Sequence, residues 1–264
     1  MCDEYVMRTI EDIKFEIERE YEKISAITKE KYSTQIKYLH MQYNLLFEFL
    51  SNYYEYGNIK HDDTNQFILC YSLFSEMVRK QKIALQLILR GDYSEAAELA
   101  RHMMQSCYQI KYITRNKDSW KDWFKQQSYE QDKLTEKELR NPNTIFSDFK
   151  RLLTQLNELD YYVTYQKLCS WSHPSIESMR SNLELSEEDM HKYFFTNRFS
   201  EDKAEALINL LFGFINTANW EGFKDTFRIR EPVPKVLEEY KKLHEEAKFV
   251  FDKFYSNEEQ KIDT

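Results

Sequence analysis

The chain has 264 residues, enough for one large domain or two modest ones, and 42% of them are hydrophobic, which allows a substantial core. It contains only four Gly and four Pro, which excludes a fold rich in tight β-hairpins because those turns depend mainly on these residues. The net charge of −8 argues against a general nucleic-acid coat protein, which would be basic, although it leaves room for a local basic pocket.

Helical spacing of apolar residues predicts two helices at the N-terminus, over residues 3–30 and 33–56, with Gly57 ending the second. We expect residues 1–57 to form a helical hairpin. A third helix, from Thr64 to Gly91, is rich in Phe, Ile, Leu and Cys, so it is expected to be central and buried.

The rest of the chain continues the helical pattern. Ser94 is a candidate N-cap for the fourth helix, and Asp160 for the helix that ends where His173 precedes Pro174, because the residue before proline is pushed out of the α region. The other predicted elements are a short Trp-bearing element after residue 116, an amphipathic helix at 144–159, a long helix at 201–230 and a C-terminal helix at 232–256. The prediction is one all-α domain over 1–264, with a core bundle at 64–230 and long N- and C-terminal helices.

The sequence shows no signal for export or membrane insertion. The N-terminus is acidic and lacks the apolar region of a signal peptide, and no apolar run approaches the roughly 18 residues of a membrane span. We therefore expect a cytoplasmic protein without membrane contact.

Several common catalytic motifs are missing. Four glycines at 57, 91, 213 and 222 allow neither a phosphate-binding loop nor a dinucleotide fingerprint, and there is no H-E-x-x-H or G-x-S-x-G motif. The four cysteines form no C-x-x-C pair. No cofactor or metal site is expected.

The fourth helix carries an arginine in apolar surroundings. Arg101 and Gln105 are four residues apart and share a helix face, which Tyr108 and Tyr112 continue. An arginine in such a helix must reach water or pair with an acceptor. Arg101 is therefore either a structural ion-pair partner or an anion-binding residue.

The second candidate group is the loop that contains Ser172, His173 and Ser175. Proline ends the preceding helix here, and an imidazole held in such a loop can titrate near neutral pH. His173 is either a loop anchor that bonds backbone groups or a residue that transfers protons.

Short motifs along residues 65–215 resemble an uncharacterised bacterial all-helical family that is grouped with HEPN-like and abortive-infection proteins. The matching positions are Ala97, Leu99, Ala100, Arg101, Gln105, Tyr112, Ile113, Trp120, Trp123, Tyr165, Leu168, Ser172, His173, Pro174 and Ser175. The resemblance implies a HEPN-like core, a homodimer and metal-independent RNA cleavage. In that chemistry His173 moves a proton and Arg101 stabilises the charged phosphorane. Gln105, Tyr108, Tyr112, Ser172 and Ser175 would then contact the substrate.

The sequence also departs from that family. The usual HEPN ribonuclease motif places Arg and His four to six residues apart on one helix, and this sequence contains no such pair. In addition, Gln105 stands where the helical family carries Glu. Two functions therefore stay open. One is a ribonuclease effector of a bacterial defence or toxin–antitoxin system with a protein antitoxin, and the other is a non-catalytic helical module that binds a protein or senses a ligand. The segment around Gly91 also looks like one tetratricopeptide turn, but it does not repeat at the expected spacing of about 34 residues.

Overall fold

The computed structural model describes residues 10–52, 64–116, 118–127, 145–172, 199–217, 235–243 and 245–247. Within these ranges all regular structure is helical, so the predicted all-α fold is confirmed. The helices are α1 (Ile10–Lys31), α2 (Ser33–Ser51), α4 (Thr64–Arg90), α5 (Tyr93–Arg115), α6 (Ser119–Gln127), the 3-10 turn η3 (Ile145–Ser147), α8 (Phe149–Leu156), α9 (Tyr161–Ser172) and α11 (Glu201–Thr217). Residues 235–243 and 245–247 are also helical.

Parts of the predicted helices, including Gly57 and residues 218–230, lie outside the described residues. None of the helices in the described ranges has the length and hydropathy needed to cross a bilayer.

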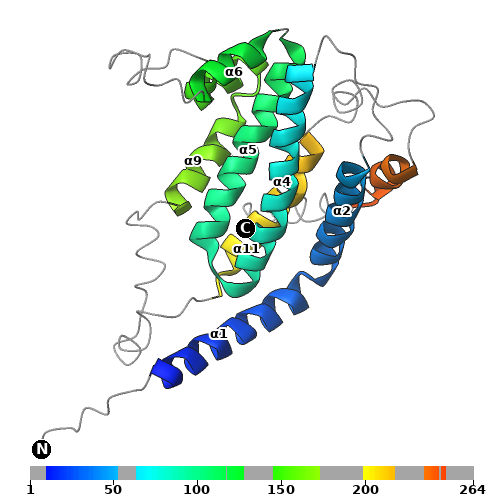
Figure 1. Cartoon of the computed structure of the whole chain (residues 1–264). Helices are drawn as coiled ribbons and strands as arrows, with labels where there is room; N and C mark the ends of the chain where they lie inside the picture. The colour runs from blue at the N-terminus through cyan, green and yellow to red at the C-terminus, as the bar shows by residue number, and fades with distance from the viewer. Residues whose placement is uncertain are drawn as a thin grey trace, which may run out of the picture.

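The centre of the bundle is the antiparallel hairpin of α4 and α5 (Figure 1). Gly91 joins them with a positive φ of 79°, a conformation that costs glycine little because it has no Cβ. The Gly91 N–H donates to the Ile88 carbonyl at 3.1 Å, and the Asp92 N–H donates to the Leu87 carbonyl at 3.0 Å. These two bonds form a Schellman cap, which satisfies carbonyls at the end of α4.

The predicted cap of the fourth helix is wrong. Asp92 occupies the N-cap position of α5, although its side chain makes no capping hydrogen bond. Ser94 lies inside the first turn, where its hydroxyl donates to the Glu95 carboxylate at 2.7 Å. The tight turn at Gly91 starts the helix two residues earlier than a serine cap would.

Helix α5 packs against α4, α6, α8, α9 and α11. Its side chains toward the core are buried: Ala96, Ala97, Ala100, Met103, Met104, Cys107, Tyr108, Ile110 and Ile113. Three alanines near the hairpin end allow close approach of the neighbouring helices, and the larger residues fill the space farther along. Burial of each large apolar side chain contributes about 1.5–3 kcal/mol.

The N-terminal helices do not form the predicted hairpin. The chain bends at Tyr32 but does not reverse, because backbone hydrogen bonds continue across the junction from Tyr32 to Thr28 and from Ile36 to Tyr32, both at 2.9 Å. Tyr32 itself is buried and its hydroxyl donates to the Glu201 carbonyl at the start of α11. In Figure 1 α1 consequently passes across the Gly91 end of the α4–α5 hairpin, where it contacts α4, and α2 continues beside the bundle.

A neutral polar cluster of Gln42, Gln81 and Tyr240, called the glutamine cluster below, links α2 and the helical segment 235–243 to the core. The buried Gln81 on α4 donates through Nε2 to Oε1 of the buried Gln42 on α2 at 2.6 Å and to the Leu211 carbonyl on α11 at 3.5 Å. Gln42 donates to the hydroxyl of Tyr240, in the helical segment 235–243, at 3.4 Å. Amide and phenol groups thus connect four separate helices.

Candidate functional site

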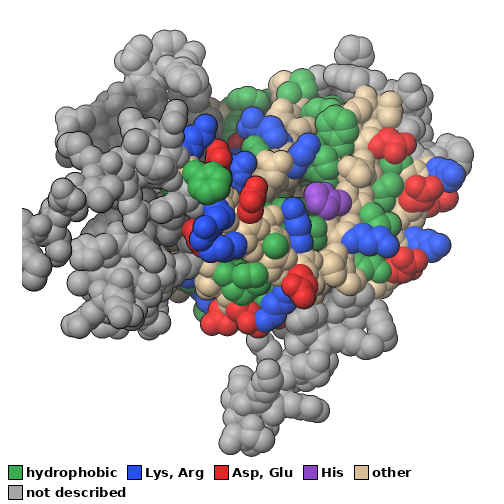
Figure 2. Space-filling view, turned by 90° about the horizontal axis from the view of Figure 1, so that it is seen from below, with side chains coloured by type: hydrophobic (Ala, Val, Ile, Leu, Met, Phe, Trp, Pro, Cys, Tyr) green, Lys and Arg blue, Asp and Glu red, His purple; other side chains and the backbone are tan. Residues whose placement is uncertain are grey.

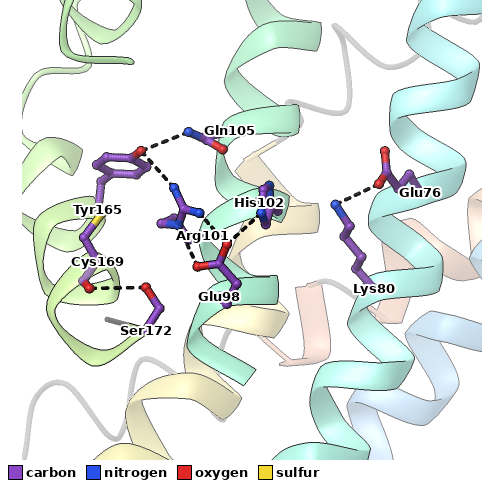
Figure 3. A network of polar contacts seen from close by, with 9 residues as sticks. All are labelled: Glu76, Lys80, Glu98, Arg101, His102, Gln105, Tyr165, Cys169 and Ser172. Carbon is purple, nitrogen blue, oxygen red and sulfur yellow. Dashed lines mark hydrogen bonds and ion pairs between the residues drawn. The ribbon is translucent and has the colours of Figure 1, made fainter. Parts of the chain in front are cut away.

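Arg101 lies on α5 where α9 packs against it, with 17% of its side chain exposed. Its Nε donates to Oε2 of Glu98 at 3.1 Å, its Nη2 forms an ion pair with Oε1 of Glu98, and its Nη1 donates to the Tyr165 hydroxyl at 3.4 Å (Figure 3). The hydrogen bonds from Arg101 lower the pKa of Glu98 to about 2 and outweigh its partial burial. Glu98 is therefore an anion at any physiological pH.

His102 shares the same carboxylate. Its Nε2 lies 2.9 Å from Oε1 of Glu98, and 42% of its side chain is exposed. Burial, and then the nearby cations Lys80 and Arg101, lower the pKa of His102 below its usual value, and the opposing effect of Glu98 is smaller. The imidazole is thus neutral near pH 7. Because an ionised carboxylate accepts hydrogen bonds, Nε2 carries the proton and Nδ1 carries the lone pair.

Tyr165 brings α9 into the cluster. Its hydroxyl accepts hydrogen bonds from Gln105 Nε2 at 2.9 Å and from Arg101. Partial burial raises the pKa of Tyr165, and the hydrogen bond from Arg101 opposes that rise. The phenol therefore stays protonated near neutral pH and joins two side chains of α5 to α9.

Helix α9 runs antiparallel to α5. Beyond Tyr165, the ring of Tyr161 lies 5.8 Å from that of Tyr108, and Glu158 pairs with Lys111 one turn farther along α5. In the opposite direction α9 ends at Ser172, whose hydroxyl donates to the Cys169 carbonyl at 3.2 Å. Ser172 follows Tyr165 by seven residues, which is about 10 Å of helix.

Of the predicted site residues, the structure brings together Arg101 and Gln105, both through Tyr165. Tyr108 is only 1% exposed and lies in the core. Tyr112 is half-buried and its ring contacts Phe146, about three helical turns from Arg101. Ser172 lies at the end of α9.

His173 and Ser175 fall outside the described residues, so their distance from Arg101 stays a prediction.

Three residues of this cluster were not predicted from the sequence as site residues: Glu98, His102 and Tyr165. Glu98 precedes Arg101 by three positions and His102 by four, which are the spacings at which helical side chains meet. The carboxylate partner was therefore readable from the sequence. Tyr165 was not, because it lies 64 positions from Arg101 and reaches it only through the packing of α9.

Among the described residues there is no group of three or more His, Cys, Asp or Glu side chains that could hold a metal ion. Comparisons with models of protein families, with curated proteins and with solved structures found no match. The chemistry of this cluster has to be judged from its own geometry.

The surface carries both signs of charge. On the face shown in Figure 2, Lys and Arg side chains are interleaved with Asp and Glu and with apolar groups. Recognition of an anion on such a surface depends on individual cations such as Arg101, because neighbouring charges of opposite sign weaken any long-range field. We call the group of Glu98, Arg101, His102, Gln105 and Tyr165 the Arg101 cluster. It offers a cation, a neutral imidazole and a phenol that are connected by hydrogen bonds.

Proposed function

We propose that the chain is a HEPN-like helical effector of a bacterial defence or toxin–antitoxin system, and that it cleaves RNA without a metal ion at the Arg101 cluster. The observation that carries this proposal is the Glu98 carboxylate shared by Arg101 and His102. It holds a cation and a neutral imidazole side by side on α5. These are the two groups that phosphodiester cleavage through the 2′-hydroxyl requires.

In the proposed reaction Nδ1 of His102 accepts the 2′-hydroxyl proton, and the 2′-oxygen attacks the adjacent phosphorus. The bond to the 5′-oxygen breaks and that oxygen takes a proton from His173, which leaves a 2′,3′-cyclic phosphate and a 5′-hydroxyl. Arg101 donates to the phosphoryl oxygens while negative charge accumulates there. Its bonds to Glu98 and Tyr165 use three of the five N–H groups of a guanidinium, so donors remain for the phosphate.

The resemblance noted above also favours a homodimer and a protein antitoxin. A nuclease that acts on cellular RNA needs such restraint, and an antitoxin that covers the Arg101 cluster would provide it.

The proposal is tested by incubating the purified protein with total tRNA, beside His102→Ala, Arg101→Ala and His173→Ala variants. Loss of a general base or acid typically costs about 10²–10⁴-fold in rate, so each variant should be at least about 100-fold slower. His40→Ala is a matched control, because His40 is exposed on α2, away from this cluster. The products should carry cyclic phosphate ends, and EDTA should not reduce the rate.

Cleavage by all variants at the wild-type rate, or no cleavage by the wild type, would contradict the proposal.

The second candidate is a non-catalytic module that binds a protein partner or senses a ligand. It is favoured by the two-point pairing of Arg101 with Glu98, which neutralises the guanidinium within the chain. Exposed apolar side chains also favour it: Val163 is 69% exposed, Phe15 66% and Phe47 56%. A wild type that leaves tRNA intact but recovers a stoichiometric partner from native lysate would support this function over the first.

A further inference from the structure

A continuous series of cations and aromatic rings leads across α9 toward Arg101. Lys150 Nζ on α8 lies 5.6 Å from the ring centroid of Tyr162. The ring of Tyr162 lies 6.0 Å from that of Tyr165 and is tilted from it by only 20°. Tyr165 in turn bonds Arg101 through its hydroxyl. We call Lys150, Tyr162 and Tyr165 the α8–α9 track.

The outer end of the track is accessible. Lys150 is exposed and Tyr162 is partly exposed, whereas Tyr165 is packed between Phe149, 4.4 Å away between centroids, and Arg101. The nearby carboxylates are largely engaged: Asp148 accepts the Arg151 N–H as the N-cap of α8, and Glu158 pairs with Lys111. Among the described residues Lys150 forms no ion pair, so its charge is available to a ligand, although the exposed Asp160 lies two residues before Tyr162 in the sequence.

Alternation of exposed rings and cations is the usual means of binding a single-stranded nucleic acid. Bases stack on the rings and phosphates meet the cations, whereas a duplex keeps its base faces covered. We propose that the α8–α9 track binds the single-stranded RNA segment next to the phosphate held at Arg101, with one base on Tyr162 and a phosphate at Lys150. This inference rests on the proposed function, since it assigns a binding subsite to the same substrate.

The contact between Lys150 and Tyr162 does not block such binding. An exposed cation–π contact is weaker than a base stacked on an aromatic ring, so a base can replace the ammonium group over Tyr162. Lys150 is a flexible exposed side chain, and a small rotation carries its charge from the ring to a phosphate. The same two residues therefore supply both contacts.

Helix α9 also provides a matched control. Lys167 Nζ lies 5.0 Å from the centroid of Trp171, which is a second lysine–aromatic pair on the same helix. Trp171 follows Tyr162 by nine residues, or about 180° around an α-helix, so this pair lies on the opposite flank. It does not lead to Arg101.

The test is the binding of a short fluorescent single-stranded RNA with 2′-O-methyl groups, which cannot be cleaved through the 2′-oxygen, measured by anisotropy over a range of salt concentrations. Tyr162→Ala should weaken binding about tenfold, while Tyr162→Phe should bind like the wild type. Lys150→Ala should weaken it severalfold and reduce the slope of log affinity against log salt by about 0.7, the value for one phosphate contact. Lys167→Ala and Trp171→Ala should change little, and the same sequence as a duplex should compete poorly.

The inference is overturned if the Lys150 and Tyr162 variants bind like the wild type, if the Lys167 variant is affected equally, or if the wild type binds no single-stranded RNA. Should Tyr162→Ala unfold in a thermal melt, Lys150→Glu carries the test, because that side chain is exposed. Binding through the track without cleavage of unmodified RNA refutes the proposed catalysis but keeps the subsite. Cleavage at the wild-type rate by the Lys150→Ala and Tyr162→Ala variants, measured at an RNA concentration well below saturation, refutes the subsite alone.

Discussion

Two polar clusters cross the helix contacts of this bundle, and they differ in charge and in access to water. The glutamine cluster joins α2, α4 and α11 through neutral amides that are buried. The Arg101 cluster joins α5 and α9 through the bonds of Arg101 and Gln105 to Tyr165, and it contains an ionised pair, Glu98 and Arg101, that remains partly exposed. Buried neutral hydrogen bonds fix the positions of helices, whereas open ionised groups are available to ligands. We therefore expect the glutamine cluster to contribute mainly to stability and the Arg101 cluster to be the one that a ligand can reach.

The largest expected effect is a loss of protein stability when the glutamine cluster is disrupted. Gln81→Ala should lower the free energy of unfolding by about 3 kcal/mol, because it leaves a cavity and removes the donor to Gln42 and to the Leu211 carbonyl. Urea unfolding followed by circular dichroism measures this loss. Gln105→Ala removes an amide from the partly exposed cluster and should cost less than about 1 kcal/mol. Equal losses of unfolding free energy in the two variants would show that the two clusters contribute equally to stability.

A smaller effect is expected in the pH dependence of stability. The folded-state pKa of Glu98 is depressed to about 2, so its ion pair stabilises the fold above the ordinary value of 4.5 and is lost as pH falls toward 2. After allowance for solvent screening of a partly exposed group, the change is about 1 kcal/mol. In urea titrations from pH 5 downward, the Glu98→Gln variant should not show this loss of unfolding free energy. Gln81→Ala should keep the wild-type pH dependence, since it removes only neutral groups.

The smallest effect concerns the imidazole of His102. NMR titration should give a pKa below 6.5, and Lys80→Met should raise it, because Lys80 is the cation with the larger effect on this histidine. Lys82→Met is the control: Lys82 is also on α4, but it lies over the ring of Tyr43, 5.1 Å from the centroid. An unchanged pKa of His102 in the Lys80 variant would mean that Lys80 does not influence this imidazole, and that burial and Arg101 lower its pKa.

Most of the fold followed from local signals in the sequence. Periodic apolar residues located the helices, and Gly91 ended α4 where a glycine was expected. The bend at Tyr32 could not be foreseen, because this residue is held by Glu201, 169 positions away. Long-range packing, absent from local patterns, replaced the expected hairpin with a bend.

The candidate site divides in the same way. Arg101 and Gln105 were recognised from their spacing on one helix, and Glu98 and His102 could have been found by the same rule. Tyr165 depends on the docking of α9, and the meeting of Arg101 with His173 depends on residues that the structure does not describe. Spacing along one helix is readable from sequence, but the approach of two helices is decided by the whole core.

The glycine turn at Gly91 has a consequence for the order of assembly. It joins the two longest described helices, of 27 and 23 residues, through a connection so short that their mutual contacts form between near neighbours in sequence. Contacts of this kind close small loops and form fast. We expect α4 and α5 to pair early. Helices α9 and α11, which come from distant parts of the chain, would then pack onto this pair.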